Sequence, residues 1–364
     1  MSILLFLILA IKPEGFFEYQ GEIFNLKGEY KFVGYSKLNL TSRQRISSSY
    51  FRTDLVYISY HGKTQYDLTD FMPEYALLSI PFTYKSRLYF RNAFLRVRIS
   101  PLTLQFGRQQ IGWGTGYAFN PTNVFQKKSI LDPSYELDGV DALRMFLDIA
   151  DFFDVDLLYI PENSVDSSSY GGRLRGNAKG FLDFSLGYLD YLSTYMDPVI
   201  FLPFKKKNKI FTLDFSTEFL GIGVHGEGTY NLKTKKKIGL LGIDYTFNDG
   251  LTSCLLEYLR NEEGKDNFRD YNPADWLDYL SGYTLTMGQN EFFFNLERIH
   301  ELFTFKISSI ININDKSTIV MPAISYSFND YTSLQITSYV GLGRDGTEYS
   351  NINDGVIFRI RVGF

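Results

Sequence analysis

The last ten residues, Gly355 to Phe364, read G-V-I-F-R-I-R-V-G-F. Side chains on a β-strand alternate between two faces, so this stretch predicts a strand with two contrasting sides. One side carries only apolar residues: Val356, Phe358, Ile360, Val362 and Phe364. The opposite side carries Arg359 and Arg361. In a soluble two-sheet protein the apolar side would point into a core and the arginines into water, so the strand alone does not decide the fold.

The chain stops on an aromatic residue, and this narrows the choice. An amphipathic last strand that ends in phenylalanine resembles the C-terminal strand of bacterial outer-membrane β-barrels. The resemblance implies that Phe364 is a signal read by the barrel-assembly machinery. It also implies a reversed orientation, because apolar side chains of a membrane barrel face lipid and polar ones line the interior.

Composition fits a barrel better than other membrane proteins. Aromatic residues make up 17% of the 364 residues, the net charge is −4 and the mean hydropathy is −0.13. That hydropathy excludes a helical membrane protein, whereas the aromatic share suits a barrel with aromatic girdles at both membrane interfaces. The lone Cys254 cannot form an intrachain disulfide, and the mild acidity gives no sign of a nucleic-acid partner.

An apolar run occupies Ile3 to Ile11. It is far shorter than the roughly 20 residues that a membrane-spanning helix needs. It looks like the apolar region of a secretory signal peptide, although no lysine or arginine precedes it. We therefore predict a signal peptide or its remnant at 1–12 and a single barrel over 13–364, with a buried first strand as the alternative for the run.

Alternating segments follow one another along the rest of the chain and predict an all-β, antiparallel, up-and-down transmembrane barrel of about 18 strands. The predicted strands are 16–25, 29–40, 49–61, 86–99, 102–112, 137–149, 152–160, 170–178, 181–190, 208–217, 220–231, 236–247, 250–260, 286–297, 301–313, 317–328, 331–342 and 355–364. Sixteen strands is the alternative, because link 41–48 is long and link 26–28 is short for their expected sides of the membrane.

The links between these strands alternate in length. Tight turns such as Ser100-Pro101 and Asn248-Asp249 alternate with long links such as 113–136 and 261–285. Transmembrane barrels have short periplasmic turns and long outer loops, whereas a soluble sandwich has no reason to sort its loops in this way.

The polar faces of the strands predict the lining of the pore. The predicted basic residues are Arg96, Arg98, Arg108, Arg144, Arg359 and Arg361. The predicted acidic residues are Asp183, Asp214, Glu227 and Glu291. One hypothesis is that a basic arc faces an acidic arc and sets a transverse field across the pore. The alternative is that neighbouring strands pair their charges, as Arg173 or Arg175 would with Asp154 or Asp156.

Two arginines conflict with strict alternation. Arg108 falls on the same face as Leu104 and Phe106, where it would meet lipid at high cost. Either a bulge near Gly107 turns it inward, or it lies at the membrane interface and extends to water. Arg91 presents the same difficulty.

The stretch from Gly107 to Arg144 contains G-R-Q, W-G, N-P-T and G-V-D-A-L-R in that order. It covers about a tenth of the chain and resembles Gram-negative outer-membrane barrels of porin type. The resemblance implies that loop 113–136 folds back into the pore and narrows it. Trp113 and Phe119 would anchor the loop by burial, with Asn120 and Pro121 at the constriction.

Enzyme and metal sites have weaker support. The histidines are His61, His225 and His300, and none stands in a readable motif with a serine and a carboxylate. The one weak calcium candidate consists of Asp270, Asp275 and Asp278, which more often would solvate an outer loop or cap a short helix over 273–280. No cofactor is implied.

These features together predict an integral outer-membrane channel for passive diffusion of small hydrophilic solutes or ions through a charged constriction. A structural or partner-binding barrel of an envelope assembly is the alternative, and a hydrolase is a weaker one. The expected partners are outer-membrane lipid, lipopolysaccharide, the solutes and the barrel-assembly machinery, with a homo-oligomer or an envelope partner left open.

Overall fold

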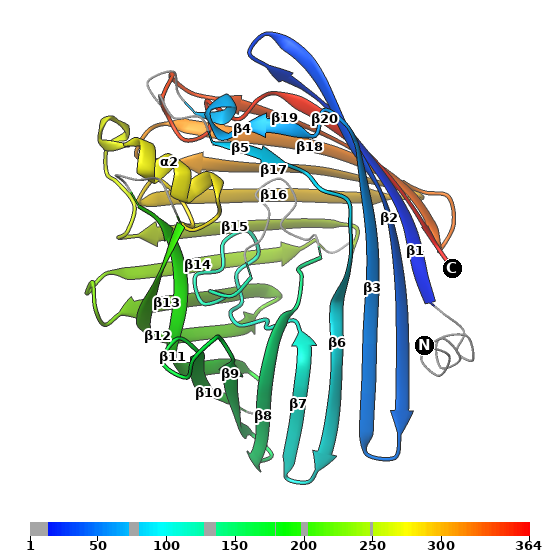
Figure 1. Ribbon diagram of the computed structural model, residues 1–364, viewed down its shortest axis with the longest axis vertical. Helices are drawn as coiled ribbons and strands as arrows, with labels where there is room; N and C mark the ends of the chain where they lie inside the picture. Colours follow the sequence, from blue (N-terminus) through cyan, green and yellow to red (C-terminus); the bar gives the residue numbers. More distant parts are fainter. Residues whose placement is uncertain (1–13, 73–79, 127–135, 179, 198–202, 248–249) are drawn as a thin grey trace.

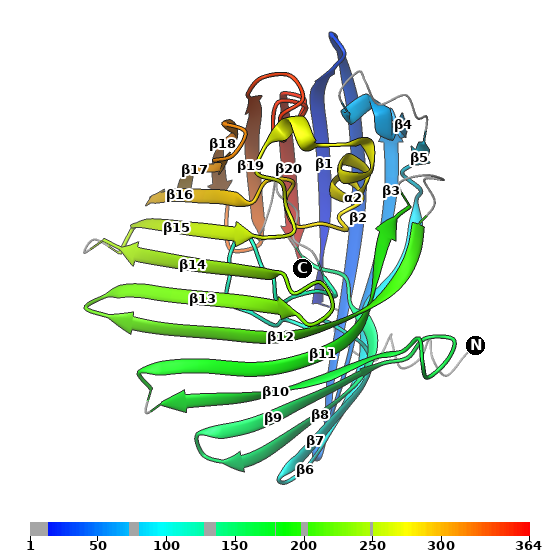
Figure 2. The same cartoon turned by 90° about the vertical axis from the view of Figure 1, so that its left-hand side faces the viewer.

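The chain closes into a cylinder of antiparallel strands (Figures 1 and 2). The structure is a computed structural model that describes residues 14–72, 80–126, 136–178, 180–197, 203–247 and 250–364. Each strand of the barrel wall pairs with the next wall strand along the chain, and the last, β20 (Gly355–Gly363), pairs with the first, β1 (Glu14–Leu26), to close an 18-stranded sheet. The predicted fold class and strand number are therefore confirmed, and the alternative of 16 strands is wrong. The predicted signal segment 1–12 lies outside the described residues.

The barrel strands are β1 (Glu14–Leu26), β2 (Glu29–Ile46), β3 (Ser49–Gly62), β6 (Arg87–Ile99), β7 (Leu102–Gln109), β8 (Val140–Ala150), β9 (Phe153–Ile160), β10 (Ser169–Ala178), β11 (Leu182–Met196), β12 (Pro203–Phe219), β13 (Ile222–Asn231), β14 (Lys237–Thr246), β15 (Thr252–Asn261), β16 (Asn290–His300), β17 (Phe303–Asn312), β18 (Ser317–Ser327), β19 (Thr332–Leu342) and β20 (Gly355–Gly363). The link 41–48 that disturbed the predicted count is mostly strand, because β2 continues to Ile46 and turns to β3 within two residues.

The longer links lie at one end of the barrel and carry the remaining elements. These are the small sheet of β4 (Gln65–Asp67) and β5 (Pro81–Thr83), the short 3-10 helices η1 (Leu68–Phe71) and η2 (Phe268–Asp270), and helix α2 (Pro273–Leu280). Helix α2 matches the predicted helix, and Asn272 and Asp275 form a capping box at its start. No helix among the described residues is long and apolar enough to cross a membrane.

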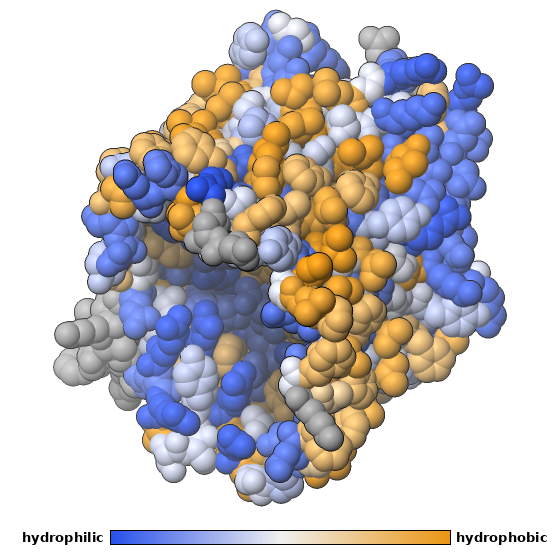
Figure 3. All heavy atoms as spheres, turned by 180° about the vertical axis from the view of Figure 1, so that it is seen from behind, coloured by the Kyte–Doolittle hydropathy of each residue, from blue (hydrophilic) through white to orange (hydrophobic). Residues whose placement is uncertain are grey.

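The terminal strand β20 shows which way the faces point. The apolar face that runs from Val356 to Phe364 lies on the outside, where these two residues are 42% and 55% exposed. On the inside, Arg361 pairs with the fully buried Glu18 at 2.6 Å and Arg359 donates to Gln20. Apolar residues cover much of the outer surface, whereas hydrophilic residues line the hollow (Figure 3). This reversed pattern is that of a membrane-spanning barrel with a polar interior.

A β-bulge resolves one of the two conflicting arginines. The register between β3 and β6 shifts between Asp54 and Leu55, which leaves Arg91 as an extra residue in β6. Arg91 and the next residue, Asn92, are consequently both buried inside. Arg91 forms an ion pair with Glu136 there.

Arg108 corrects a prediction, because it does not line the pore. Strand β7 keeps strict alternation through Gly107, so Arg108 lies on the outer face with Phe106. Its guanidinium forms a 2.6 Å ion pair with Asp141 of β8, which is also exposed. Both residues stand near the loop end of their strands, where a long side chain reaches water at the membrane interface. The predicted bulge near Gly107 is absent, and the interfacial alternative holds.

The closing seam between β1 and β20 depends on a glycine. Gly21 pairs with Phe358, and a Cβ at Gly21 would lie 2.2 Å from the Phe358 ring. The Phe358 ring therefore lies directly over the backbone of β1, and only a glycine at position 21 leaves space for it. At the end of the seam, Gly15 and Phe364 exchange two backbone hydrogen bonds of 3.0 Å.

We predict that Gly21→Val destabilises the folded barrel by about 1–3 kcal/mol, because the new side chain must displace the Phe358 ring. The measurement is the temperature at which the protein unfolds in detergent, and the change in mobility in gel electrophoresis distinguishes folded from unfolded protein. Gly239→Val is the matched control, since a Cβ there meets nothing within 4 Å. An equal transition temperature for the two variants would contradict this account of the seam.

Candidate functional site in the barrel lumen

A loop between β7 and β8 lies inside the barrel, within the ring of strands in both views (Figures 1 and 2). Strand β7 ends at Gln109, earlier than predicted, because the chain leaves the wall there and enters the lumen. We call residues 110–126 the inner loop; the remainder of the predicted constriction segment is described only at residue 136. Ile111, Trp113 and Phe119 of the inner loop are all buried.

Trp113 fastens the start of the inner loop to the wall. Its indole N–H donates to Asp156 of β9 at 3.2 Å, and the Arg173 guanidinium lies 4.9 Å from the centre of its ring. Asp156 also pairs with Arg144 at 2.6 Å and with Arg173 at 3.2 Å. A fully buried carboxylate thus holds two arginines and the loop at one point, and the Arg173 guanidinium also lies 4.0 Å from a second carboxylate, Asp214.

Two carboxylates farther along the wall, on β13 and β15, hold the middle of the inner loop. Glu257 of β15 accepts backbone N–H bonds from Tyr117, from Ala118 at 2.8 Å and from Phe119 at 3.4 Å. Glu227 of β13 accepts the backbone N–H of Gly116 at 3.2 Å. Charge-assisted bonds of this kind are about twice as strong as neutral ones, so the loop is docked rather than merely placed in the lumen.

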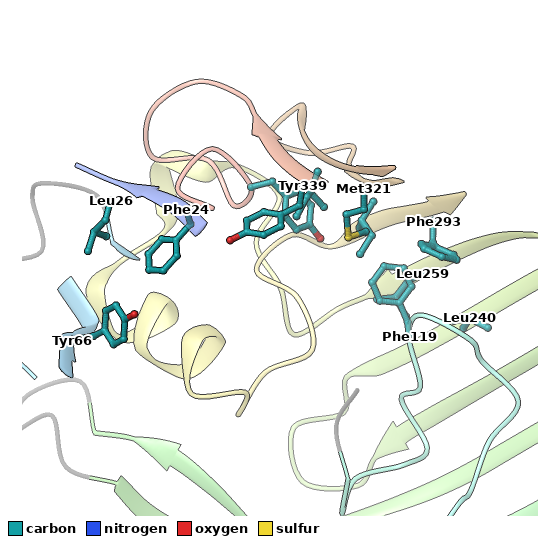
Figure 4. Close-up of a cluster of buried hydrophobic side chains, with 12 residues drawn as sticks. Phe24, Leu26, Tyr66, Phe119, Leu240, Leu259, Phe293, Met321 and Tyr339 are labelled. Carbon is teal, nitrogen blue, oxygen red and sulfur yellow. The ribbon is translucent and has the colours of Figure 1, made fainter. Parts of the chain in front are cut away.

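Several further contacts make the docking specific. The Thr122 hydroxyl donates to Glu227, and Gly114 has a φ of +86° with no room for a Cβ between Glu227 and Thr122. The Tyr117 ring stacks on Phe293 at 5.7 Å. Phe119 points toward an apolar patch of the wall that includes Leu259 (Figure 4). Asn120 accepts the backbone N–H of Asn123 within the loop, next to the buried Pro121.

The predicted basic residues occupy different surroundings. Arg96 points inward and donates to the Gln105 amide at 2.7 Å, whereas Arg98 pairs with Asp148 at 3.4 Å near a short turn. Arg144 belongs to the Asp156 network, and Arg361 pairs with Glu18. Arg175 pairs with Asp154 at 2.6 Å, so the predicted pairing of charges on neighbouring strands is confirmed for these strands.

The predicted acidic residues do not form one open wall. Glu227 is buried under the inner loop, and Glu291 is buried beneath the outer loops, where it accepts a hydrogen bond from Tyr349. Asp214 accepts from Ser185, and Asp183 accepts from Asn177 near a short turn. Docking and hydrogen bonding therefore engage these four carboxylates, and the two-arc field stays a hypothesis.

Sequence reasoning missed Glu257, although it makes three contacts to the loop. It is a fully buried carboxylate in a strand whose other residues, such as Leu255 and Leu256, are largely apolar. A single carboxylate in such a strand is a signal that could have identified it, since burial of an unpaired charge is costly. His225 completes its surroundings at 3.1 Å.

Cavities lie on both sides of the inner loop. One of about 420 Å³ is bounded by inner-loop residues such as Phe119 and by the outer loop around Tyr283. Another of about 740 Å³ opens among the short turns and is lined by carboxylates such as Asp148 and Asp183. The inner loop therefore stands between an outer and a turn-side chamber.

The outer loops pack on one another through buried carboxylates. Glu348 accepts backbone N–H bonds from Met287 at 3.1 Å and Gly288 at 3.0 Å, and its own N–H donates to Asp315 at 2.7 Å. Burial, reinforced by the nearby Asp315 charge, raises the pKa of Glu348 to about 7. These contacts join the loop after β19 to the loop before β16.

One residue of the calcium candidate caps a helix. Asp275 caps α2 by accepting the backbone N–H of Asn272 at 3.0 Å. Within the described residues, no group of three histidine, cysteine or acidic side chains could hold a metal ion. His61 stacks with Tyr19 at 5.4 Å, and His300 ends β16 at a short turn.

Comparisons with known proteins support the fold. No protein-family model matches the chain, and no curated protein matches it. Among solved structures, OccD3 (OpdP) of Pseudomonas aeruginosa is similar with a TM-score of 0.55 and 8% identity, over 97% of this chain and 91% of that chain. A variant of the Rhodopseudomonas blastica porin is similar with a TM-score of 0.51 and 10% identity, over 97% of this chain and 100% of that chain.

We predict that Glu257→Ala releases the middle of the inner loop. Three backbone N–H groups lose their acceptor, so amide hydrogen exchange around Tyr117 to Phe119 should quicken by about tenfold or more. Mass spectrometry of the detergent-solubilised barrel measures this exchange. Glu162→Ala is the control, because the Glu162 carboxylate forms an exposed ion pair with Lys205 and accepts no inner-loop N–H among the described residues. Unchanged exchange in Glu257→Ala would rule out docking through this carboxylate.

Proposed function

We propose that this protein is an integral outer-membrane, porin-like channel for passive diffusion of small hydrophilic solutes or ions. The observation that carries the proposal is the inner loop, which is docked inside a polar-walled, lipid-facing barrel between two chambers. A barrel of this strand number leaves an aqueous interior unless something fills it. The inner loop fills part of that interior and leaves a constriction beside it.

The constriction favours anions in this proposal. The inner loop covers Glu227 and Glu257, so these carboxylates no longer face open water. Arg96, in contrast, is exposed inside the barrel and hydrogen-bonds to an amide, and it forms no ion pair within the described residues. An exposed positive charge in the lumen that no described carboxylate neutralises raises the local concentration of anions.

An enzymatic role has less support. His225 contacts Glu257, which the inner loop already engages, and His61 contacts a tyrosine. The proposal therefore involves no covalent chemistry and no cofactor. The expected partners are outer-membrane lipid, lipopolysaccharide and the barrel-assembly machinery, which would recognise Phe364. The proposal is compatible with a single barrel and with an oligomer of barrels.

The test of the channel function is liposome swelling with sugars of increasing size, together with conductance in planar bilayers. We expect swelling with the smaller sugars and a cut-off set by the constriction. A purified, folded barrel that gives neither swelling nor conductance would instead be a structural or partner-binding subunit, and the channel proposal would fail.

We predict that Arg96→Gln shifts the permeability ratio toward cations by about two- to threefold, a modest change because salt screens a charge in a water-filled pore. The ratio comes from the reversal potential across a bilayer in asymmetric salt. Arg108→Gln is the matched control, since it removes the same charge from the outer face. Equal shifts in both variants, or none in Arg96→Gln, would refute the selectivity proposal.

A further inference from the structure

Another cavity, of about 240 Å³, lies beside the outer ends of β1 and β19. It adjoins the outer chamber through Tyr279, Leu280 and Ile352, and none of the described inner-loop residues lines it. Aromatic rings from β1, the β4–β5 region, α2 and β19 line it: Phe24, Tyr66, Phe71, Tyr84, Trp276 and Tyr339. Phe24 and Tyr339 point toward one another across the space above α2 (Figure 4). Four separate segments of the chain therefore supply aromatic side chains to one small chamber.

Neighbouring rings among these six are in contact, so the aromatic wall of the cavity, which we call the aromatic box, is preformed. Tyr66 lies 6.1 Å from Phe24 and 5.8 Å from Tyr84, centre to centre. Trp276 and Tyr339 are almost completely buried, whereas Tyr84 is 44% exposed and gives the cavity an open side. Aromatic faces carry negative potential, so a chamber walled by them attracts a cation.

The charged side chains that line the cavity are acidic, so they too favour a cation. Glu22 of β1 lines it and accepts a hydrogen bond from the Tyr339 hydroxyl. No lysine, arginine or histidine is among the described residues that line the cavity, and Glu22 takes part in no ion pair within the described part of the chain. Glu348, the other lining carboxylate, is already held by the N–H groups of Met287 and Gly288.

One ring of the box already meets a cation from the chain itself. The Lys63 ammonium lies 5.4 Å from the centre of the Tyr66 ring. Lys63 is not among the residues that line the cavity, so the box itself keeps its aromatic and acidic surface. An inorganic divalent ion fits poorly there, because it needs six or more oxygen ligands and the rings supply few.

We propose that this cavity binds a small organic cation of the alkylammonium class, with its charge against Glu22 and its methyl or methylene groups against the rings of Tyr66, Tyr84 and Trp276. The volume lies below the roughly 300–1,000 Å³ of drug-sized pockets and so limits the ligand to a few carbon atoms around the nitrogen. Aromatic boxes with a carboxylate recognise such ions because the rings replace water around the weakly hydrated methyl groups. No described residue of the inner loop lines this site, so its occupancy can be measured without any measurement of conduction.

The test uses isothermal titration of the full-length barrel in detergent with tetramethylammonium. Its uncharged counterpart of similar shape, tert-butanol, is titrated in parallel. We expect saturable binding of tetramethylammonium at millimolar concentrations or below, and binding of the neutral compound weaker by at least about tenfold. Absence of saturable tetramethylammonium binding, or equal binding of the two compounds, would overturn the proposal.

Variants assign the binding to this cavity. Glu22→Gln keeps the shape and a hydrogen-bond acceptor for Tyr339, and we expect it to weaken tetramethylammonium binding by about tenfold or more. Trp276→Leu should weaken it as well. Glu29→Gln is the control, because Glu29 is an exposed residue at the start of β2 that pairs with Lys31. If Glu22→Gln and Trp276→Leu both fold and bind as tightly as the unaltered protein, the cavity is not the site.

Discussion

The pairing of every backbone N–H and C=O across strands is the constraint on which the structure depends. A strand in hydrocarbon has no water to satisfy its unpaired groups, so the sheet must return to its first strand. The return is made by β20, whose residues pair with β1 from Gly355 to Gly363. Because Gly21 has no side chain, the Phe358 ring can lie over this seam on the lipid side. Any larger residue at position 21 would clash with the ring.

Closure creates a second constraint inside the barrel. The inward faces carry many charges, and a charge in a partly filled lumen needs a partner or a passage of water beside it. Asp156 meets this need by joining Arg144, Arg173 and Trp113. Glu257 meets it with the backbone of the inner loop. The wall therefore specifies where the loop lies, and the loop in turn removes the wall's carboxylates from solvent.

The sequence was sufficient for the barrel because a two-residue period and alternating link lengths are properties of the whole chain. The alternation in the terminal strand also predicted its two faces correctly, with the apolar face toward lipid and the arginines toward the lumen. Local register was less accessible. Arg91 and Arg108 look alike in sequence, yet a bulge turns the first inward and regular alternation leaves the second outside. A bulge depends on the partner strand, and a single strand's pattern does not report it.

The lumen was harder still to predict, because its electrostatics depend on contacts between distant segments. Glu227 was expected to face the pore, and its position on the inner face is as expected. The inner loop, more than 100 positions earlier in the chain, covers it with the Gly116 N–H. Counting charges by strand therefore overstates the number of carboxylates that face open water. What decides the field is which carboxylates have found a partner: Asp156 has arginines, Glu257 has backbone amides, and Glu22, within the described residues, has a tyrosine hydroxyl and no cation.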